Sequence, residues 1–75
     1  MPVRRRTESA IERLSRRVRT LRDERGWSQA QLAVRAELDR SYLAGIELGK
    51  RNPTLKALEK LASAFSMSLS ELFGE

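Results

Sequence analysis

Cysteine and histidine are both absent from this chain of 75 residues. Without cysteine no disulfide framework can form, and without either residue zinc lacks its usual thiolate and imidazole ligands. A serine nucleophile would also have no imidazole base to activate it. We therefore expect a protein that is not an enzyme, that holds no metal or other cofactor, and that works in the cytoplasm.

Long apolar runs are missing as well. No stretch approaches the roughly 20 apolar residues that span a bilayer, and the basic start at residues 1–6 lacks the apolar stretch of a signal peptide. A chain of this size buries only about 60% of the surface that its unfolded form exposes, which leaves little room for a deep pocket. We expect one small domain with no membrane partner and no small-molecule ligand.

Positive charge is plentiful and unevenly placed. The chain has 15 Lys and Arg residues against 10 Asp and Glu residues, which gives a net charge of +5. Residues 1–25 contain nine arginines and four acidic residues, whereas residues 26–48 carry a small negative excess. A basic surface suits a polyanionic partner, and the split suggests that one part of the chain anchors that partner while another recognises it in detail.

Helix signals recur along the chain, and no strand pattern competes with them. Two apolar stripes have helical spacing and predict buried faces: Ile11, Leu14, Val18 and Leu21, and then Leu55, Leu58, Leu61, Ala62 and Phe65. Capping residues mark five helix starts: Ser9, Ser28, Asp39, Thr54 and Ser68. We predict an all-α domain, a compact bundle of five helices over residues 9–75, preceded by a flexible basic arm over residues 1–8.

Residues 28–49 predict two short helices set around a three-residue corner. Ala33 lies where these helices must cross closely, and a larger side chain there would push them apart. The apolar side chains that join the two helices are Leu32, Ala36, Leu43 and Ile46. With these turned inward, the second helix presents unusually small residues to the outside, which suits a surface that lies in a groove of DNA.

The spacing of Gln29, Leu32, Ala33, Leu43 and Ile46 resembles the helix-turn-helix of the phage-repressor and Cro-like, or XRE-type, family. The resemblance runs from Leu14 to Phe73. It is strongest for short stand-alone regulators such as the controller proteins of restriction–modification systems, which share a run similar to residues 40–47 followed by Gly49, Arg51, Asn52, Pro53 and Thr54. It implies a lambda-repressor-like fold and a transcriptional regulator that binds a near-palindromic operator in double-stranded DNA, with residues 39–48 as the recognition helix.

The corner departs from the family at Glu37, where many members have glycine. If the backbone has a positive φ at this position, a residue other than glycine costs about 1 kcal/mol or slightly more. We expect the motif to tolerate that cost, with a small effect on the angle between the two helices.

Four residues of the recognition helix are predicted to face the bases: Arg40, Ser41, Ala44 and Gly45. Arg40 would pair with guanine, Ser41 would discriminate weakly, and Ala44 would touch a thymine methyl group. Two alternatives stay open: Arg40 contacts phosphate or Asp39, and Gly45 allows close packing against the next helix or another protein. With so few hydrogen-bonding side chains, part of the specificity would come from DNA shape.

The resemblance places five residues at the sugar–phosphate backbone: Gln29, Tyr42, Lys50, Arg51 and Asn52. Gln29 also lies at a helix N-terminus, which favours an anion. The alternatives are a simple capping role for Gln29, half-buried packing for Tyr42 and plain solvation for the three loop residues.

Arg22 and Glu47 match a family ion pair that joins the first helix to the recognition helix, which is a structural role. The other arginines of the first helix are expected to form a mostly solvated face: Arg13, Arg16, Arg17 and Arg19. For the triplet Arg4–Arg6 we favour an arm that raises the local density of cations over one that enters a minor groove.

The C-terminal segment predicts a homodimer. This segment has four apolar residues, Met67, Leu69, Leu72 and Phe73. They are more than are needed to cover the core beneath them. Those left uncovered would form a self-complementary patch, and a two-fold axis there would set the recognition helices about 34 Å apart, one turn of DNA.

Two functions are compatible with this sequence. The first is a DNA-binding regulator that blocks or recruits RNA polymerase. The alternative is a protein-interaction or antitoxin-like module that uses the same helical surface. The two differ in their response to salt, since only binding that neutralises phosphates weakens steeply as salt rises.

Overall fold

Residues 9–74 are described in the structure, a computed structural model, and they form five helices and no strand. The helices are α1 (Ala10–Glu24), α2 (Gln29–Ala36), α3 (Arg40–Glu47), α4 (Leu55–Ala64) and α5 (Leu69–Leu72). The predicted all-α bundle is confirmed. The arm predicted over residues 1–8, which includes Arg4–Arg6, lies outside the described residues.

Each helix begins directly after the residue that the sequence predicts as its cap. Ser9, Ser28 and Ser68 form complete capping boxes with the acidic or amide side chain three residues later. Asp39 and Thr54 accept hydrogen bonds from backbone N–H groups in the first turns of α3 and α4. Because a cap satisfies amides that no intrahelical bond reaches, these short helices start at defined positions.

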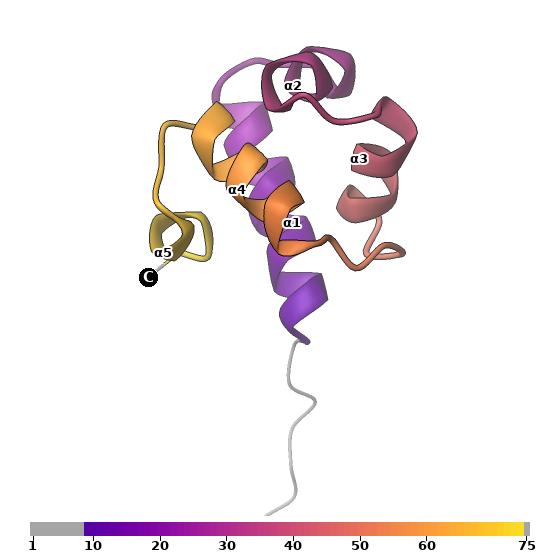
Figure 1. The fold of residues 1–75 in the computed structure, drawn as a ribbon, viewed down its shortest axis with the longest axis vertical. Helices are drawn as coiled ribbons and strands as arrows, with labels where there is room; N and C mark the ends of the chain where they lie inside the picture. The colour runs from indigo at the N-terminus through magenta and orange to yellow at the C-terminus, as the bar shows by residue number, and fades with distance from the viewer. Residues whose placement is uncertain (1–8, 75) are drawn as a thin grey trace, which may run out of the picture.

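Helix α3 lies at the edge of the bundle. It packs against α1 and α2, while α4 packs against α2 and α5. Figure 1 shows α3 and α5 on opposite sides of α1 and α4. A macromolecule bound to the outer side of α3 therefore leaves α5 accessible to another partner.

One core joins side chains from all five helices: Leu14, Val18, Leu21, Leu32, Ala33, Ala36, Leu43, Ile46, Leu61, Ala62, Phe65 and Leu72. The prediction of a buried Leu55 was wrong, because this side chain is 63% exposed. Leu55 is the first residue of α4, and the helix reaches the core only later, at Ala57 and Leu61.

The corner between α2 and α3 has a left-handed backbone at Glu37. The sequence predicted a strain cost at this residue only if its φ were positive. Glu37 has φ 55° and ψ 46°, so a residue other than glycine occupies a conformation that costs about 1–2 kcal/mol. The N–H of Leu38 donates to the carbonyl oxygen of Ala33 at 2.9 Å, and the Lys60 ammonium donates to the carbonyl oxygen of Glu37 at 3.2 Å. These bonds fix the corner in spite of the strained residue.

Three of the four arginines expected on a solvated face of α1 are exposed, namely Arg13, Arg16 and Arg19, whereas Arg17 is partly buried. Arg17 donates to the carbonyl oxygens of Leu72 and Glu71 at 3.0 and 2.8 Å, and Arg13 donates to that of Phe73 at 3.0 Å. These bonds form because the C-terminal end of α5 lies within reach of the Arg13 and Arg17 side chains. A cation at a helix C-terminus satisfies exposed carbonyl groups and interacts favourably with the helix dipole. Arg13 and Arg17 therefore hold α5 in place.

Candidate nucleic-acid interface

The N-terminus of α3 is organised by Asp39. Its Oδ2 atom accepts hydrogen bonds from the backbone N–H groups of Ser41 and Tyr42 at 3.1 and 3.2 Å, and also from the Ser41 hydroxyl. The bond from the Ser41 hydroxyl, the two backbone bonds and the nearby Arg51 together hold the pKa of Asp39 below its ordinary value of 3.8. Asp39 is therefore an ionised cap at neutral pH.

The inner and outer sides of α3 differ sharply. Leu43, Ile46 and Glu47 are buried against the other helices. The opposite side, which we call the outer face, consists of the four predicted base-facing residues: Arg40, Ser41, Ala44 and Gly45. The side chains of Arg40 and Ser41 are exposed, and Ala44 and Gly45 are partly exposed. All four thus lie on the side of α3 opposite its buried residues, and Arg40 and Ser41 are the most accessible of them.

Gly45 lies beneath the side chain of Arg51. A Cβ atom at position 45 would collide with the Cγ atom of Arg51. The carbonyl oxygen of Gly45 also accepts from the N–H groups of Lys50 and Arg51, at 2.9 and 3.2 Å. The close neighbour of Gly45 within the chain is therefore the stem of Arg51, which neither sequence-based interpretation of this glycine included. Glycine at position 45 lets the loop after α3 fold back across the helix.

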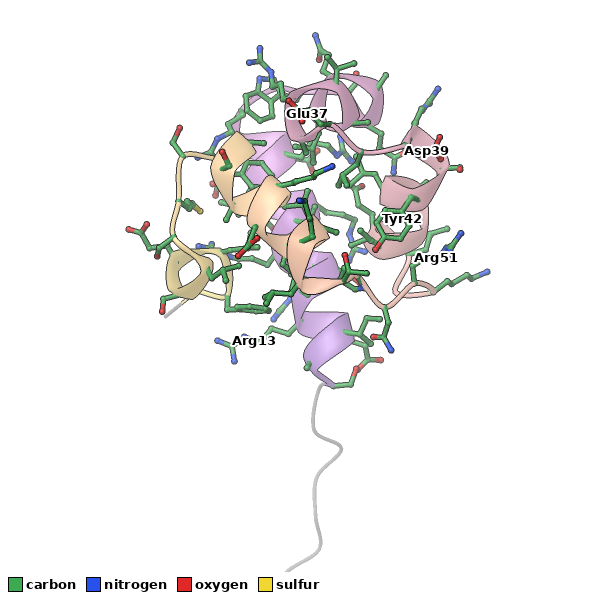
Figure 2. All side chains as sticks on the ribbon, in the orientation of Figure 1. Arg13, Glu37, Asp39, Tyr42 and Arg51 are labelled. Carbon is green, nitrogen blue, oxygen red and sulfur yellow. The ribbon has the colours of Figure 1, made fainter. Side chains whose placement is uncertain are left out.

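Tyr42 ties α3 to the start of α4. Its hydroxyl oxygen accepts a hydrogen bond from the N–H of Thr54 at 3.2 Å, and the Arg51 guanidinium lies 5.3 Å from the centre of its ring. Figure 2 shows Asp39, Tyr42 and Arg51 along the same side of the molecule. The half-buried Tyr42 thus supports both the loop and the guanidinium above it. Lys50 and Asn52 are exposed beside Arg51 on the same loop.

Behind α3, Arg22 and Glu47 form the expected ion pair. The Nε and Nη2 atoms of Arg22 lie 2.8 and 3.0 Å from the two carboxylate oxygens of Glu47, which is only 2% exposed. The Nη1 atom of Arg22 donates to the carbonyl oxygen of Trp27 at 2.8 Å. The hydrogen bond to Glu47 raises the pKa of Arg22 above its ordinary value. This pair fastens α3 to α1 with a fixed rotation.

Gln29 belongs to the same network. Its side-chain N–H donates to the Oε1 atom of Glu47 at 3.0 Å. An amide nitrogen carries two N–H groups, so one of them is committed to Glu47. Gln29 is the first residue of α2, and the contact joins the start of that helix to the end of α3. It is more than the capping partner that the sequence offered as its alternative role.

Two polar residues of α1 also hold α3: Ser15, which the sequence did not single out, and Arg19, which was expected only on a solvated face. The buried Ser15 hydroxyl donates to the carbonyl oxygen of Ile46 at 2.7 Å, and Arg19 donates to the carbonyl oxygen of Glu47. Both carbonyls belong to the last turn of α3, and that of Ile46 also accepts the N–H of Gly49 at 3.0 Å. The available signal was Ser15 itself, a small polar residue within the apolar stripe of the first helix.

The described residues contain no cluster of three or more acidic, cysteine or histidine side chains that would hold a metal ion. Within residues 9–74, no helix is both long enough and apolar enough to cross a membrane.

A family model described as helix-turn-helix matches residues 18–72. The immunity repressor protein of Bacillus phage phi105 is 44% identical over 62 residues, which cover 83% of this chain and 43% of that protein. The chain therefore spans less than half of the phage repressor.

Two solved structures are also similar to this chain. One is the restriction–modification controller protein C.AhdI from Aeromonas hydrophila, with 42% identity, a TM-score of 0.79, and coverage of 83% of this chain and 94% of that one. Another is C.Esp1396I bound to a 19 base pair DNA duplex, with 34% identity, a TM-score of 0.78 and 85% of each chain covered. The match thus covers nearly the full length of C.AhdI.

The buried pair generates a stability prediction. Changing Glu47 to Ala leaves Arg22 without its carboxylate partner, so we expect the free energy of unfolding to fall by about 3 kcal/mol or more. The matched control is Glu59→Ala, which removes an exposed carboxylate from α4 and should change stability by less than about 0.5 kcal/mol. Urea titrations of both variants measure the difference, and equal midpoints would count against the role assigned to the pair.

Proposed function

The chain belongs to the helix-turn-helix family of DNA-binding regulators, and from this premise we propose that it is a sequence-specific transcriptional regulator acting in the cytoplasm. In this proposal α3 lies in the major groove of a near-palindromic operator, and two copies of the chain bind its two half-sites. Bound in this way, the protein blocks or recruits RNA polymerase. The similarity to an immunity repressor and to restriction–modification controller proteins supports a role of this type.

The main support for the proposal is the set of side chains on the outer face of α3. Its outer face combines the exposed Arg40 and Ser41 with the small residues Ala44 and Gly45. A slim helix surface with a guanidinium beside it fits the width and the hydrogen-bonding edges of the major groove. In this proposal Arg40, Ser41, Ala44 and Gly45 are the base-facing residues.

The phosphate contacts are proposed around this helix. Lys50, Arg51 and Asn52 are exposed on the loop after α3, where two cations and an amide lie beside the groove-facing helix. Gln29 lies at the N-terminus of α2 and keeps one side-chain N–H group beyond the one given to Glu47. The ring of Tyr42 supports Arg51, so we assign Tyr42 to the sugar–phosphate backbone together with that residue.

The dimer is proposed through α5 and its flanking residues Met67 and Phe73, with one correction. Leu72 is completely buried in the core, so it is not available to a partner. It is buried because the short α5 turns this side chain inward toward the other helices. Met67, Leu69 and Phe73 remain partly exposed. Helix α5 lies on the side of the bundle away from α3 (Figure 1). A two-fold axis there leaves both copies of α3 free to enter successive major grooves about 34 Å apart.

The DNA prediction is tested by selecting bound sequences from a random duplex pool at two salt concentrations. If a dimer neutralises about four phosphates through Lys50 and Arg51 of each copy, log affinity falls against log salt with a slope of about −3.6. Arg40→Ala should lose preference at one base pair of each half-site, about 1–3 kcal/mol, whereas the control Lys56→Ala on α4 should keep it. No enrichment, or affinity that barely responds to salt, would favour the protein-interaction or antitoxin-like module instead.

The dimer is tested by sedimentation equilibrium. Leu69→Lys places a charge in the proposed apolar patch and should shift the protein toward monomer by at least about tenfold in dissociation constant. The control Ser70→Lys adds the same charge one residue along α5, at an exposed position. A wild-type protein that remains monomeric at high micromolar concentration would remove this part of the proposal.

A further inference from the structure

The hydrogen bonds of Ser41 define what its hydroxyl group can offer to a base. Ser41 is exposed on the first turn of α3, and its hydroxyl donates to the Oδ2 atom of Asp39. The same oxygen of Asp39 accepts the backbone N–H groups of Ser41 and Tyr42, at 3.1 and 3.2 Å. Three donors from two residues thus converge on one carboxylate oxygen.

The position of the hydroxyl proton follows from the chemistry of the pair. An ionised carboxylate has no proton to give, so the hydrogen between the two oxygens belongs to Ser41. That proton is directed at Asp39. What Ser41 still presents is a pair of acceptor lone pairs, and the second carboxylate oxygen of Asp39 is an acceptor as well. This end of the outer face therefore accepts hydrogen bonds and does not donate them.

The neighbouring residue has the opposite character. Arg40 is exposed beside this pair and can only donate. In the major groove guanine offers two acceptors, thymine one acceptor, adenine an acceptor next to a donor, and cytosine a donor alone. The Ser41 hydroxyl oxygen and the Asp39 carboxylate are two adjoining acceptors, and they match the amino group of cytosine best. Adenine also has an amino group, but it would bring the lone pair of its N7 atom toward the same acceptors, which is repulsive.

We propose that Ser41 recognises the N4 amino group of a cytosine in the operator and that Asp39 is a positioning residue, which sets the polarity of that contact by binding the Ser41 proton. This inference rests on the proposed function. A freely rotating serine would discriminate weakly between bases. A serine whose proton is bound by Asp39 instead prefers a base that donates a hydrogen bond over one that accepts it. A thymine at the same place would turn its O4 acceptor toward the acceptors of Ser41 and Asp39 and be rejected.

The test uses the full chain and the operator obtained by selection. Each base pair of one half-site is replaced in turn by the other three, and affinities are measured at one salt concentration. We expect one position at which cytosine binds at least about tenfold better than thymine. Ser41→Ala should reduce this ratio to about one while the profile at the other positions stays unchanged. The matched control is Ser63→Ala, an exposed serine on α4, which should leave every ratio as it is.

The variant Asp39→Ser tests whether Asp39 acts by holding the Ser41 proton or only by capping α3. Serine keeps a good N-cap for α3, but its shorter side chain releases the Ser41 proton, so Ser41 can then donate or accept. We expect cytosine and thymine to become nearly equivalent at that one position. Urea midpoints of the variants and the unchanged ratios elsewhere in the half-site show that the fold and the docking are intact.

The outcomes discriminate clearly. If wild-type protein binds its operator but Ser41→Ala leaves all base preferences unchanged, or lowers affinity equally everywhere, this inference is wrong and the proposed function stands. A Ser41-dependent preference for thymine or guanine likewise refutes the assigned polarity. If no duplex is enriched at all, the proposed function fails and the inference fails with it.

Discussion

The buried contact between Arg22 and Glu47 is the interaction on which the rest of the structure depends. Its two short hydrogen bonds join α1 to α3, and Gln29 adds a third to the same carboxylate. A charge pair at this depth is costly unless every polar atom is matched, and among the described residues no buried side-chain nitrogen or oxygen lacks a partner. These bonds to Glu47 set the rotation of α3, and that rotation decides which side chains face outward.

Arginine has two separate duties in this chain. Arg19 and Arg17 of α1, and Arg25 directly after it, donate to carbonyl groups at the ends of α3, α5 and α4, respectively. These bonds let very short helices end in a defined way without long loops. On and after α3, by contrast, Arg40 and Arg51 are exposed. The positive charge of the sequence is thus split between holding the bundle together and presenting a surface to a polyanion.

Much of the fold was predictable because its signals are local. Caps such as Ser28 and Asp39 and apolar spacing act within a few residues, so the helix starts and most of the core followed from the sequence. The errors came from contacts between distant segments. Leu72 was assigned to an interface because a sequence does not show how far a four-residue helix turns its side chains inward, and the place of Arg51 over Gly45 depends on how the loop folds back. The hydrogen bond of the Ser41 hydroxyl to Asp39 likewise depends on a rotamer that no periodicity encodes.

The central claim is that the outer face of α3, oriented by Glu47, is the surface that meets DNA. Nuclear magnetic resonance spectra of the backbone amides, recorded while the selected operator duplex is added, test it most directly. The account predicts the largest shifts at residues 40–45 and 50–52, with α5 unaffected by DNA at a protein concentration where the dimer is already formed. Shifts concentrated elsewhere, with the amides of α3 unchanged at saturation, would contradict it.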